Sequence, residues 1–128
     1  MAAVTVVDAI CVAKHIEDPM ELKAKVWLER RGRFVLGDGG VALLEMVDRT
    51  GSIQEAARRV GWSYRHTWGY LKNLEEASGR RFVARRHGGA AGGGAELTAA
   101  GRDFVRRYRA FRADLDRVIR SWSRRVAA

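Results

Sequence analysis

The segment from residue 52 to residue 78 constrains the fold most, because it has the pattern of two short helices joined by a glycine turn. Ser52 and Glu55 form a capping-box pair, in which the Ser52 hydroxyl accepts from the Glu55 amide and the Glu55 carboxylate reaches back to the Ser52 amide. Gly61 predicts the end of this helix, and Ser63 predicts the N-cap of the next one. Two helices at such a tight turn predict a helix-turn-helix.

The flanking segments predict a mainly α fold with a small β-hairpin wing. β-branched and aromatic residues on both sides of a glycine-containing turn predict a short hairpin at 26–36. Asp38 is the predicted N-cap of the helix that follows. A second hairpin at 82–97 contains the glycine run 88–94, which we expect to form a long flexible tip rather than regular structure. Thr98 is the predicted N-cap of the last helix.

The pattern divides the chain into three regions. Residues 1–24 are an extension of unknown role, residues 25–97 form a winged helix-turn-helix, and residues 98–128 form a long C-terminal dimerisation helix. The apolar residues of this helix follow heptad spacing, which needs a partner surface to bury it. A helix laid across its own domain is the alternative, and the first two residues could serve it, but the seam outruns a domain this small. The predicted dimer seam consists of Phe104, Tyr108, Phe111, Leu115, Val118 and Trp122.

The second helix of a helix-turn-helix enters the major groove of DNA and reads bases from its first turns. In this chain, Thr67, Leu71 and Leu74 are its predicted buried stripe. Arg65 would face outward and can donate two hydrogen bonds to guanine O6 and N7. With this stripe, the outer side displays Arg65, His66, Gly69, Tyr70, Lys72 and Asn73.

Trp68 and Gly69 of this helix, and the wing, also bear on DNA contact. Trp68 is more often half-buried packing than a base contact at such a position. Gly69 costs about 1 kcal/mol of helix stability relative to alanine, so a close approach to DNA or to another helix would explain it. The wing carries basic residues before its glycine-rich tip, which suits phosphate or minor-groove contact. The candidate DNA-binding residues are Ser52, Gln54, Ser63, Tyr64, Arg65, His66, Trp68, Gly69, Lys72, Arg85, Arg86 and His87.

The charge balance agrees with a polyanionic partner. Lysine and arginine number 24 against 15 aspartates and glutamates, a net charge of +9, and a field of that sign attracts nucleic acid. One cysteine, Cys11, and three histidines make no metal set. No nucleophile–base spacing is present, so we expect neither an enzyme nor a cofactor. Without a signal-peptide pattern or a stretch of ~18 apolar residues, we expect a cytoplasmic protein.

Several short runs carry a family resemblance. They are Leu36 to Gly39, Ala42 to Glu45, Asp48 to Ile53, Ala56 with Ala57, Ser63 to Arg65 followed by Trp68, and, in the wing, Val83, Arg85, the glycine run, Leu97 with Thr98, and Gly101. Together they resemble the DNA-binding domain of the ModE family of molybdate-responsive regulators over about residues 25–120. The resemblance extends more weakly to LysR-type regulators. It implies a dimeric winged helix-turn-helix that represses or activates at a promoter with two half-sites.

In the ModE family, small β-barrel domains that bind molybdate would follow the last helix, whereas this sequence stops at Ala128. We therefore expect no specific molybdate binding by this chain alone. The leading function is a homodimeric, sequence-specific DNA-binding regulator of transcription, linked through the resemblance to molybdenum metabolism. The alternative is a winged-helix protein-interaction module, which we would expect to lack the basic wing and recognition face.

Overall fold

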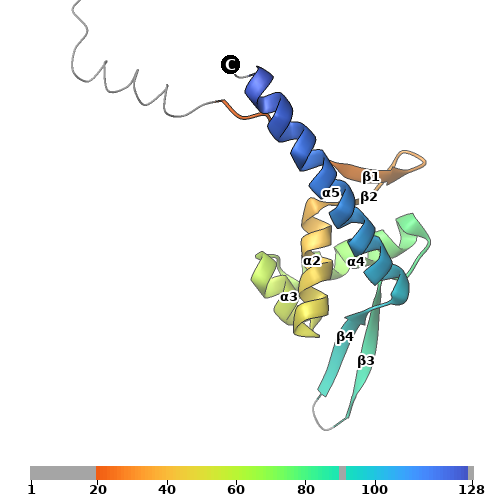
Figure 1. The fold of residues 1–128 in the computed structure, drawn as a ribbon. Helices are drawn as coiled ribbons and strands as arrows, with labels where there is room; N and C mark the ends of the chain where they lie inside the picture. The colour runs from red at the N-terminus through yellow and green to blue at the C-terminus, as the bar shows by residue number, and fades with distance from the viewer. Residues whose placement is uncertain (1–19, 90–91, 127–128) are drawn as a thin grey trace, which may run out of the picture. The chain divides into compact units, whose positions relative to one another are not determined.

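A computed structural model of the chain describes residues 20–89 and 92–126 (Figure 1). These residues fall into two compact units. The larger unit runs from Lys25 to Arg112, and the smaller one groups the two ends of the chain, of which residues 20–24 and 113–126 are described. Most of the predicted N-terminal extension, together with Cys11, lies outside the described residues.

The larger unit confirms the predicted mainly α fold with a β-hairpin wing. It contains two separate antiparallel hairpins, one before the helices and one after them. Figure 1 shows the second hairpin, the wing, projecting beyond the helices of the helix-turn-helix. In chain order the elements are β1 (Trp27–Arg30), β2 (Arg33–Gly37), α2 (Asp38–Thr50), α3 (Ile53–Val60), α4 (Tyr64–Ser78), β3 (Val83–Gly89), β4 (Gly92–Leu97) and α5 (Ala99–Val126).

The core lies where α2, α3 and α4 meet β2 and the wing strands. The predicted buried stripe of α4 is confirmed, since Thr67, Leu71 and Leu74 are all buried. The Thr67 hydroxyl donates to the Ser63 carbonyl at 2.8 Å, so this polar group is satisfied inside the core. The largest fully buried side chains are Leu36, Leu43, Leu44, Leu74, Val47 and Thr67.

The predicted end of α3 at Gly61 is confirmed, and α2 and α4 end in the same way. α2, α3 and α4 each stop at a glycine with φ between 68° and 80°, namely Gly51, Gly61 and Gly79, and this left-handed backbone strongly favours glycine. Ser63 caps α4 by accepting from the His66 amide at 3.0 Å. These contacts are local, so the sequence pattern is sufficient to place them.

Two cap predictions need correction. The N-cap of α2 is Gly37, and Asp38 is the first helical residue; the Asp38 carboxylate accepts from the Tyr108 hydroxyl instead of capping the helix. Ser52 does accept from the Glu55 amide at 3.1 Å. The return half of the box is wrong, because the Glu55 carboxylate accepts from arginines one turn further along α3. The Ser52 amide donates to the Thr50 hydroxyl at 3.3 Å.

The wing strands pair from Val83 opposite Leu97 to Gly89 opposite Gly92. The expectation that the glycine run 88–94 forms a loose tip is wrong for 88–89, the end of β3, and for 92–94, the first half of β4. At Gly94 close packing is the reason, because a Cβ there would lie 2.9 Å from the carbonyl oxygen of Gly51. The next residue of β4 donates its amide to that same carbonyl. β4 thus crosses the end of α2 at a point where only glycine fits.

The beginning of α5 packs on the larger unit. Thr98 caps it as predicted, accepting from the Gly101 amide at 3.0 Å. Phe104 stacks on Phe82 with ring centroids 5.2 Å apart, and Tyr108 is buried. These first two seam residues therefore lie in the core of their own domain, as the alternative of a helix laid across it predicts. The reason is that Phe82 leads into the wing directly beneath the first turns of α5.

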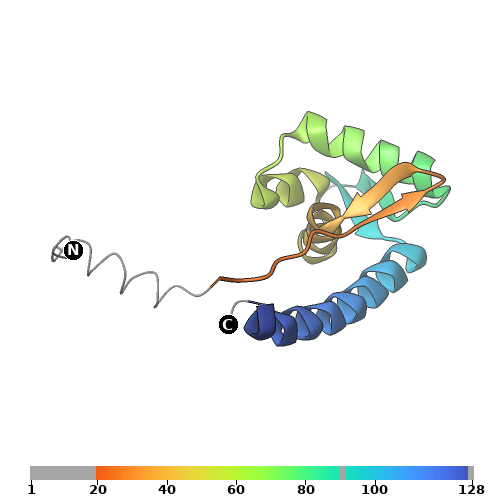
Figure 2. The same ribbon diagram turned by 90° about the horizontal axis from the view of Figure 1, so that it is seen from above.

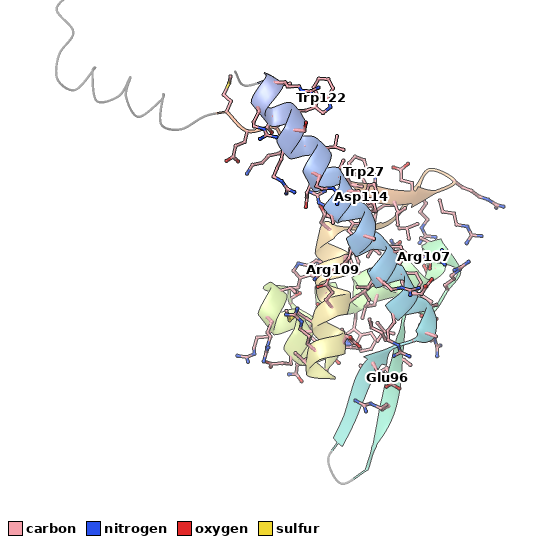
Figure 3. The ribbon with its side chains drawn as sticks, in the orientation of Figure 1. Trp27, Glu96, Arg107, Arg109, Asp114 and Trp122 are labelled. Carbon is pink, nitrogen blue, oxygen red and sulfur yellow. The ribbon has the colours of Figure 1, made fainter. Side chains whose placement is uncertain are left out.

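Of the four later seam residues, three are about half exposed within the described chain, and Leu115 is partly buried. Phe111 is 46% exposed, Val118 52% and Trp122 49%; Trp122 is labelled near the end of α5 in Figure 3. In the smaller unit, the backbone amide of Leu22 donates to the Ser123 hydroxyl at 2.9 Å.

Candidate nucleic-acid interface

The side of α4 that faces the wing carries the predicted DNA-reading residues. Tyr64, Arg65, Gly69 and Lys72 are exposed on it. Trp68 lies among them but is only half-exposed, and its ring meets Tyr64 edge-on with centroids 6.0 Å apart. The packing role that the sequence favours for Trp68 is therefore the one observed, since it contacts the core cluster.

The other flank of α4 is covered, which corrects part of the predicted outer face. Tyr70 is half-buried, its ring lies 6.1 Å from Phe34, and its hydroxyl accepts from the Gly37 amide at 3.3 Å. Burial raises the pKa of Tyr70. His66 remains exposed, although its ring lies 4.7 Å from Trp62. Tyr70 therefore packs against the first hairpin and does not belong to the exposed outer side of α4.

The first hairpin holds the second half of α4, a role that the sequence patterns do not reveal. In β1, Arg30 donates to the carbonyl of Ser78, at the end of α4, at 2.8 Å. In β2, Arg33 donates to the side-chain oxygen of Asn73 at 2.7 Å. Asn73 is therefore also engaged by this hairpin. Figure 2 shows the hairpin alongside α4. The basic turn between the two strands is the only local signal for these contacts.

A groove of about 630 Å³ separates α4 from β3. Trp68, Gly69 and Lys72 form one wall, and Val83 and Arg85 lie on the other. The guanidinium of Arg85 lies 4.5 Å above the centre of the Trp68 ring, which joins the wing to the recognition helix. The groove therefore presents an apolar floor with cationic groups at its rim.

The two adjacent wing arginines have different surroundings. Arg85 faces α4, whereas the Arg86 guanidinium lies beside the backbone of Gly51 and Gly94, at the end of α2. Successive residues of a strand point to opposite sides, which explains the separation. The side chain of His87 lies outside the described part of the structure. Of the predicted wing residues, only Arg85 is brought together with α4.

The start of α3 supplies the remaining predicted residues. Gln54 is exposed and Ser52 partly buried. The Glu55 carboxylate accepts from Arg58 at 2.6 Å and from Arg59 at 3.2 Å. The hydrogen bond from Arg58, and after it the one from Arg59, lowers the pKa of Glu55. The Glu55 carboxylate therefore stays ionised and partly neutralises the positive charge of the two arginines.

The cations on the outer side of α4 and Arg85 on β3 have no carboxylate partner among the described residues. None of the ion pairs among residues 20–89 and 92–126 involves Arg65, Lys72 or Arg85. Several other arginines of the larger unit do pair with carboxylates: Arg33 with Glu76, Arg58 and Arg59 with Glu55, Arg81 with Glu75, and Arg109 with Glu45. The cations beside the groove therefore keep their hydrogen-bond donors available for an external anion.

In the described ranges, no group of three or more His, Cys, Asp or Glu side chains could hold a metal ion. Within the same ranges, no helix combines the length and apolar character needed to cross a membrane.

Comparisons with known proteins relate this segment to bacterial helix-turn-helix regulators. Residues 40–102, which span α2 to the start of α5, match the family model of bacterial regulatory helix-turn-helix proteins of the LysR family. The molybdenum-pterin-binding protein MopB of Rhodobacter capsulatus is 39% identical over 99 residues, covering 77% of this chain and 36% of MopB. The molybdenum transport protein ModE of Azotobacter vinelandii is 35% identical, covering 74% and 37%. The transcriptional regulator ModE of Yersinia pestis is 32% identical, covering 70% and 34%.

The chain thus spans little more than a third of the length of these relatives. The matched segment contains both helices of the helix-turn-helix, the wing and the groove between them.

Proposed function

Because this chain carries a ModE-like DNA-binding domain of the LysR helix-turn-helix family, we propose that it binds duplex DNA sequence-specifically and regulates transcription. The observation that carries the proposal is the row of unpaired cations on the outer side of α4 and on β3. A protein surface gains affinity for DNA by replacing counterions on the phosphates, and only cations not already neutralised can do so.

In the proposed complex, the first turns of α4 enter the major groove. Arg65 reads guanine through its two-pronged donor geometry, and Tyr64 and Ser63 contact phosphate or base edges. Lys72 and Arg85 bind the phosphate backbone on the side of the wing. Ser52 and Gln54, at the start of α3, are placed for contacts to the neighbouring backbone.

The protein is proposed to act as a homodimer. The exposed seam residues Phe111, Val118 and Trp122 are the support, since half-exposed large side chains at heptad spacing seek a partner surface. Two-fold symmetry would present two α4 helices to major grooves about one helical turn apart. Phe104 and Tyr108 are left out of this seam because they are committed to their own domain.

Molybdate is not proposed as a ligand of the described residues. The relatives are named for molybdenum transport or molybdenum-pterin binding, but an oxyanion site needs donors that converge in a concave pocket. Around the groove, Arg81 is committed to Glu75 at 3.1 Å, and Lys72 extends from an exposed position. We propose that any response to molybdenum depends on a molybdate site outside this domain.

A mobility-shift titration across a salt series tests the proposal. The preferred site is first selected from a random pool of duplexes. Arg65→Ala should weaken binding to the selected site by about 1–3 kcal/mol and binding to random DNA by less. Lys72→Ala should weaken both about equally and reduce the salt slope by about 0.9. Arg107→Ala, an exposed arginine of α5 that pairs with Asp103, is the control and should bind like the parent. Affinity that does not change between low and physiological salt would reject the proposal.

A further inference from the structure

The contact between Arg85 and Trp68 joins the two parts of the proposed DNA-binding surface. Arg85 comes from β3, Trp68 from α4, and the guanidinium carbon lies 4.5 Å from the ring centroid. That distance is well inside the range of a cation–π interaction. No carboxylate in the described part of the chain pairs with Arg85, so the indole is what holds this cation against α4.

Stacking holds an arginine without using up its donors. A guanidinium that lies over a ring engages its flat face, while its N–H groups point outward in the plane and stay free to bind. A carboxylate partner has the opposite effect, as Arg81 shows: its Nε is bound to Glu75 at 3.1 Å in the same groove. Arg85 is therefore restrained, yet its full set of donors remains available.

Trp68 is itself well anchored for this task. Its ring is half-buried, contacts the core cluster, and is met edge-on by Tyr64 at 6.0 Å. A ring fixed by the core can fix the side chain stacked on it. Because a free arginine loses considerable rotamer entropy when it binds, an arginine ordered in advance binds more tightly.

We propose that Trp68 is a positioning residue for DNA binding, which holds Arg85 in the groove between α4 and the wing with its donors directed at the backbone of the duplex. The inference rests on the proposed function and adds to it. Trp68 acts through Arg85, not by touching DNA. The pair also fixes the wing relative to the recognition helix, so both engage one duplex in a single register.

A double-mutant cycle tests the assignment. Trp68→Leu keeps apolar bulk but removes the π face, and Arg85→Ala removes the cation. Each variant should weaken binding to the selected duplex, and the double variant should bind about as weakly as Arg85→Ala alone. The expected departure from additivity is about two- to fivefold, the size of an exposed cation–π contact. Arg85→Lys should bind more weakly than the parent but more tightly than Arg85→Ala, because an ammonium keeps the charge and can still approach the ring but lacks the fork of donors.

Trp62→Leu is the matched control. Trp62 packs on the other flank of α4, with its ring 4.9 Å from Tyr70, and does not contact Arg85. Its effect should be the same in the presence and absence of Arg85. Thermal melting of each variant ensures that binding is measured on folded protein.

The stack also has a signature without DNA. In the free protein, the side-chain protons of Arg85 should show an upfield ring-current shift in the NMR spectrum, which Trp68→Leu abolishes and Trp62→Leu leaves in place. Absence of that shift would overturn the proposal. So would a Trp68→Leu effect of equal size with and without Arg85, since Trp68 would then touch DNA directly or act only on folding. A wild-type chain that binds no duplex would reject the proposed function, whereas binding with an additive cycle would reject the positioning role alone.

Discussion

Gly69 offers a test in which stability and DNA affinity should change in opposite directions. It lies in the middle of α4, on the exposed side that lines the groove. A Cβ added there would meet no atom within 4 Å. Contact with another helix of the described chain therefore does not explain this glycine, and we propose the close approach of DNA as its explanation.

Gly69→Ala should stabilise the free protein. Glycine in a helix interior is about 0.8–1.0 kcal/mol less favourable than alanine, and the open space around Gly69 means that no steric cost offsets this gain. For a compact unit the size of Lys25–Arg112, that free energy raises the melting temperature by roughly 4–8 °C.

The same methyl group should weaken DNA binding. If the backbone of α4 lies against the duplex at Gly69, an added carbon must push the two apart, at a cost of about 1–3 kcal/mol by analogy with overpacking a core. That range corresponds to roughly 5- to 150-fold in the dissociation constant.

Thermal melting followed by circular dichroism and a mobility-shift titration on the selected duplex measure the two effects. Ala42→Gly is the mirror control: it lies at an exposed position of α2 and should lower the melting temperature without changing DNA affinity. If Gly69→Ala bound DNA as tightly as the parent, the backbone of α4 would not approach the duplex there. A lower melting temperature for Gly69→Ala would instead contradict the open geometry around the residue.

Three further outcomes are expected. Leu115→Asp places a charge in the proposed dimer seam, where desolvation without a partner costs several kcal/mol; sedimentation should show a parent dimer shifted towards monomer, and a parent that is monomeric at micromolar concentration would refute the seam. Burial, followed by the hydrogen bond to the Asp38 carboxylate, raises the pKa of Tyr108 to about 12. Its folded pKa thus exceeds the ordinary value near 10, so the stabilisation is complete below pH ~10 and is lost as the pH rises to about 12; chemical denaturation in this window should show a steeper loss for the parent than for Tyr108→Phe, and equal slopes would exclude the linkage. Calorimetry with molybdate should give no saturable heat beyond that of sulfate, and a molybdate-specific signal at micromolar affinity would reveal a site that the groove residues do not explain.

Helix boundaries and fold class could be predicted from the sequence because their causes are local. A serine that accepts from an amide three residues later begins a helix wherever it stands, and Ser52 and Ser63 both do so. Gly61 and Gly79 end their helices because few other residues adopt a left-handed backbone without strain. The helix-turn-helix and the buried stripe of α4 follow from these signals together with helical periodicity.

Contacts between segments distant in sequence could only be seen in the tertiary structure. Periodicity places Tyr70 and Asn73 opposite the buried stripe of α4, but the docking of the first hairpin engages both of them. Helical spacing likewise cannot distinguish an apolar residue that packs on its own domain from one that packs on a second copy of the chain. Tyr108 packs in the core of its own domain, where its hydroxyl donates to the carboxylate of Asp38, seventy positions earlier in the chain.

The sequence by itself determined that this protein contains a winged helix-turn-helix with Arg65 and Lys72 on the outer side of its second helix, because caps, glycine stops and helical periodicity are properties of neighbouring residues. Only the tertiary structure decided which cations on that surface are free and how they are held. Arg85 and Arg86 are adjacent and chemically identical, yet the guanidinium of Arg85 lies over the Trp68 ring and that of Arg86 lies beside Gly51. The physical reason is that strand alternation sends the two side chains to opposite faces of the wing, and what each face meets depends on how the helices pack against it.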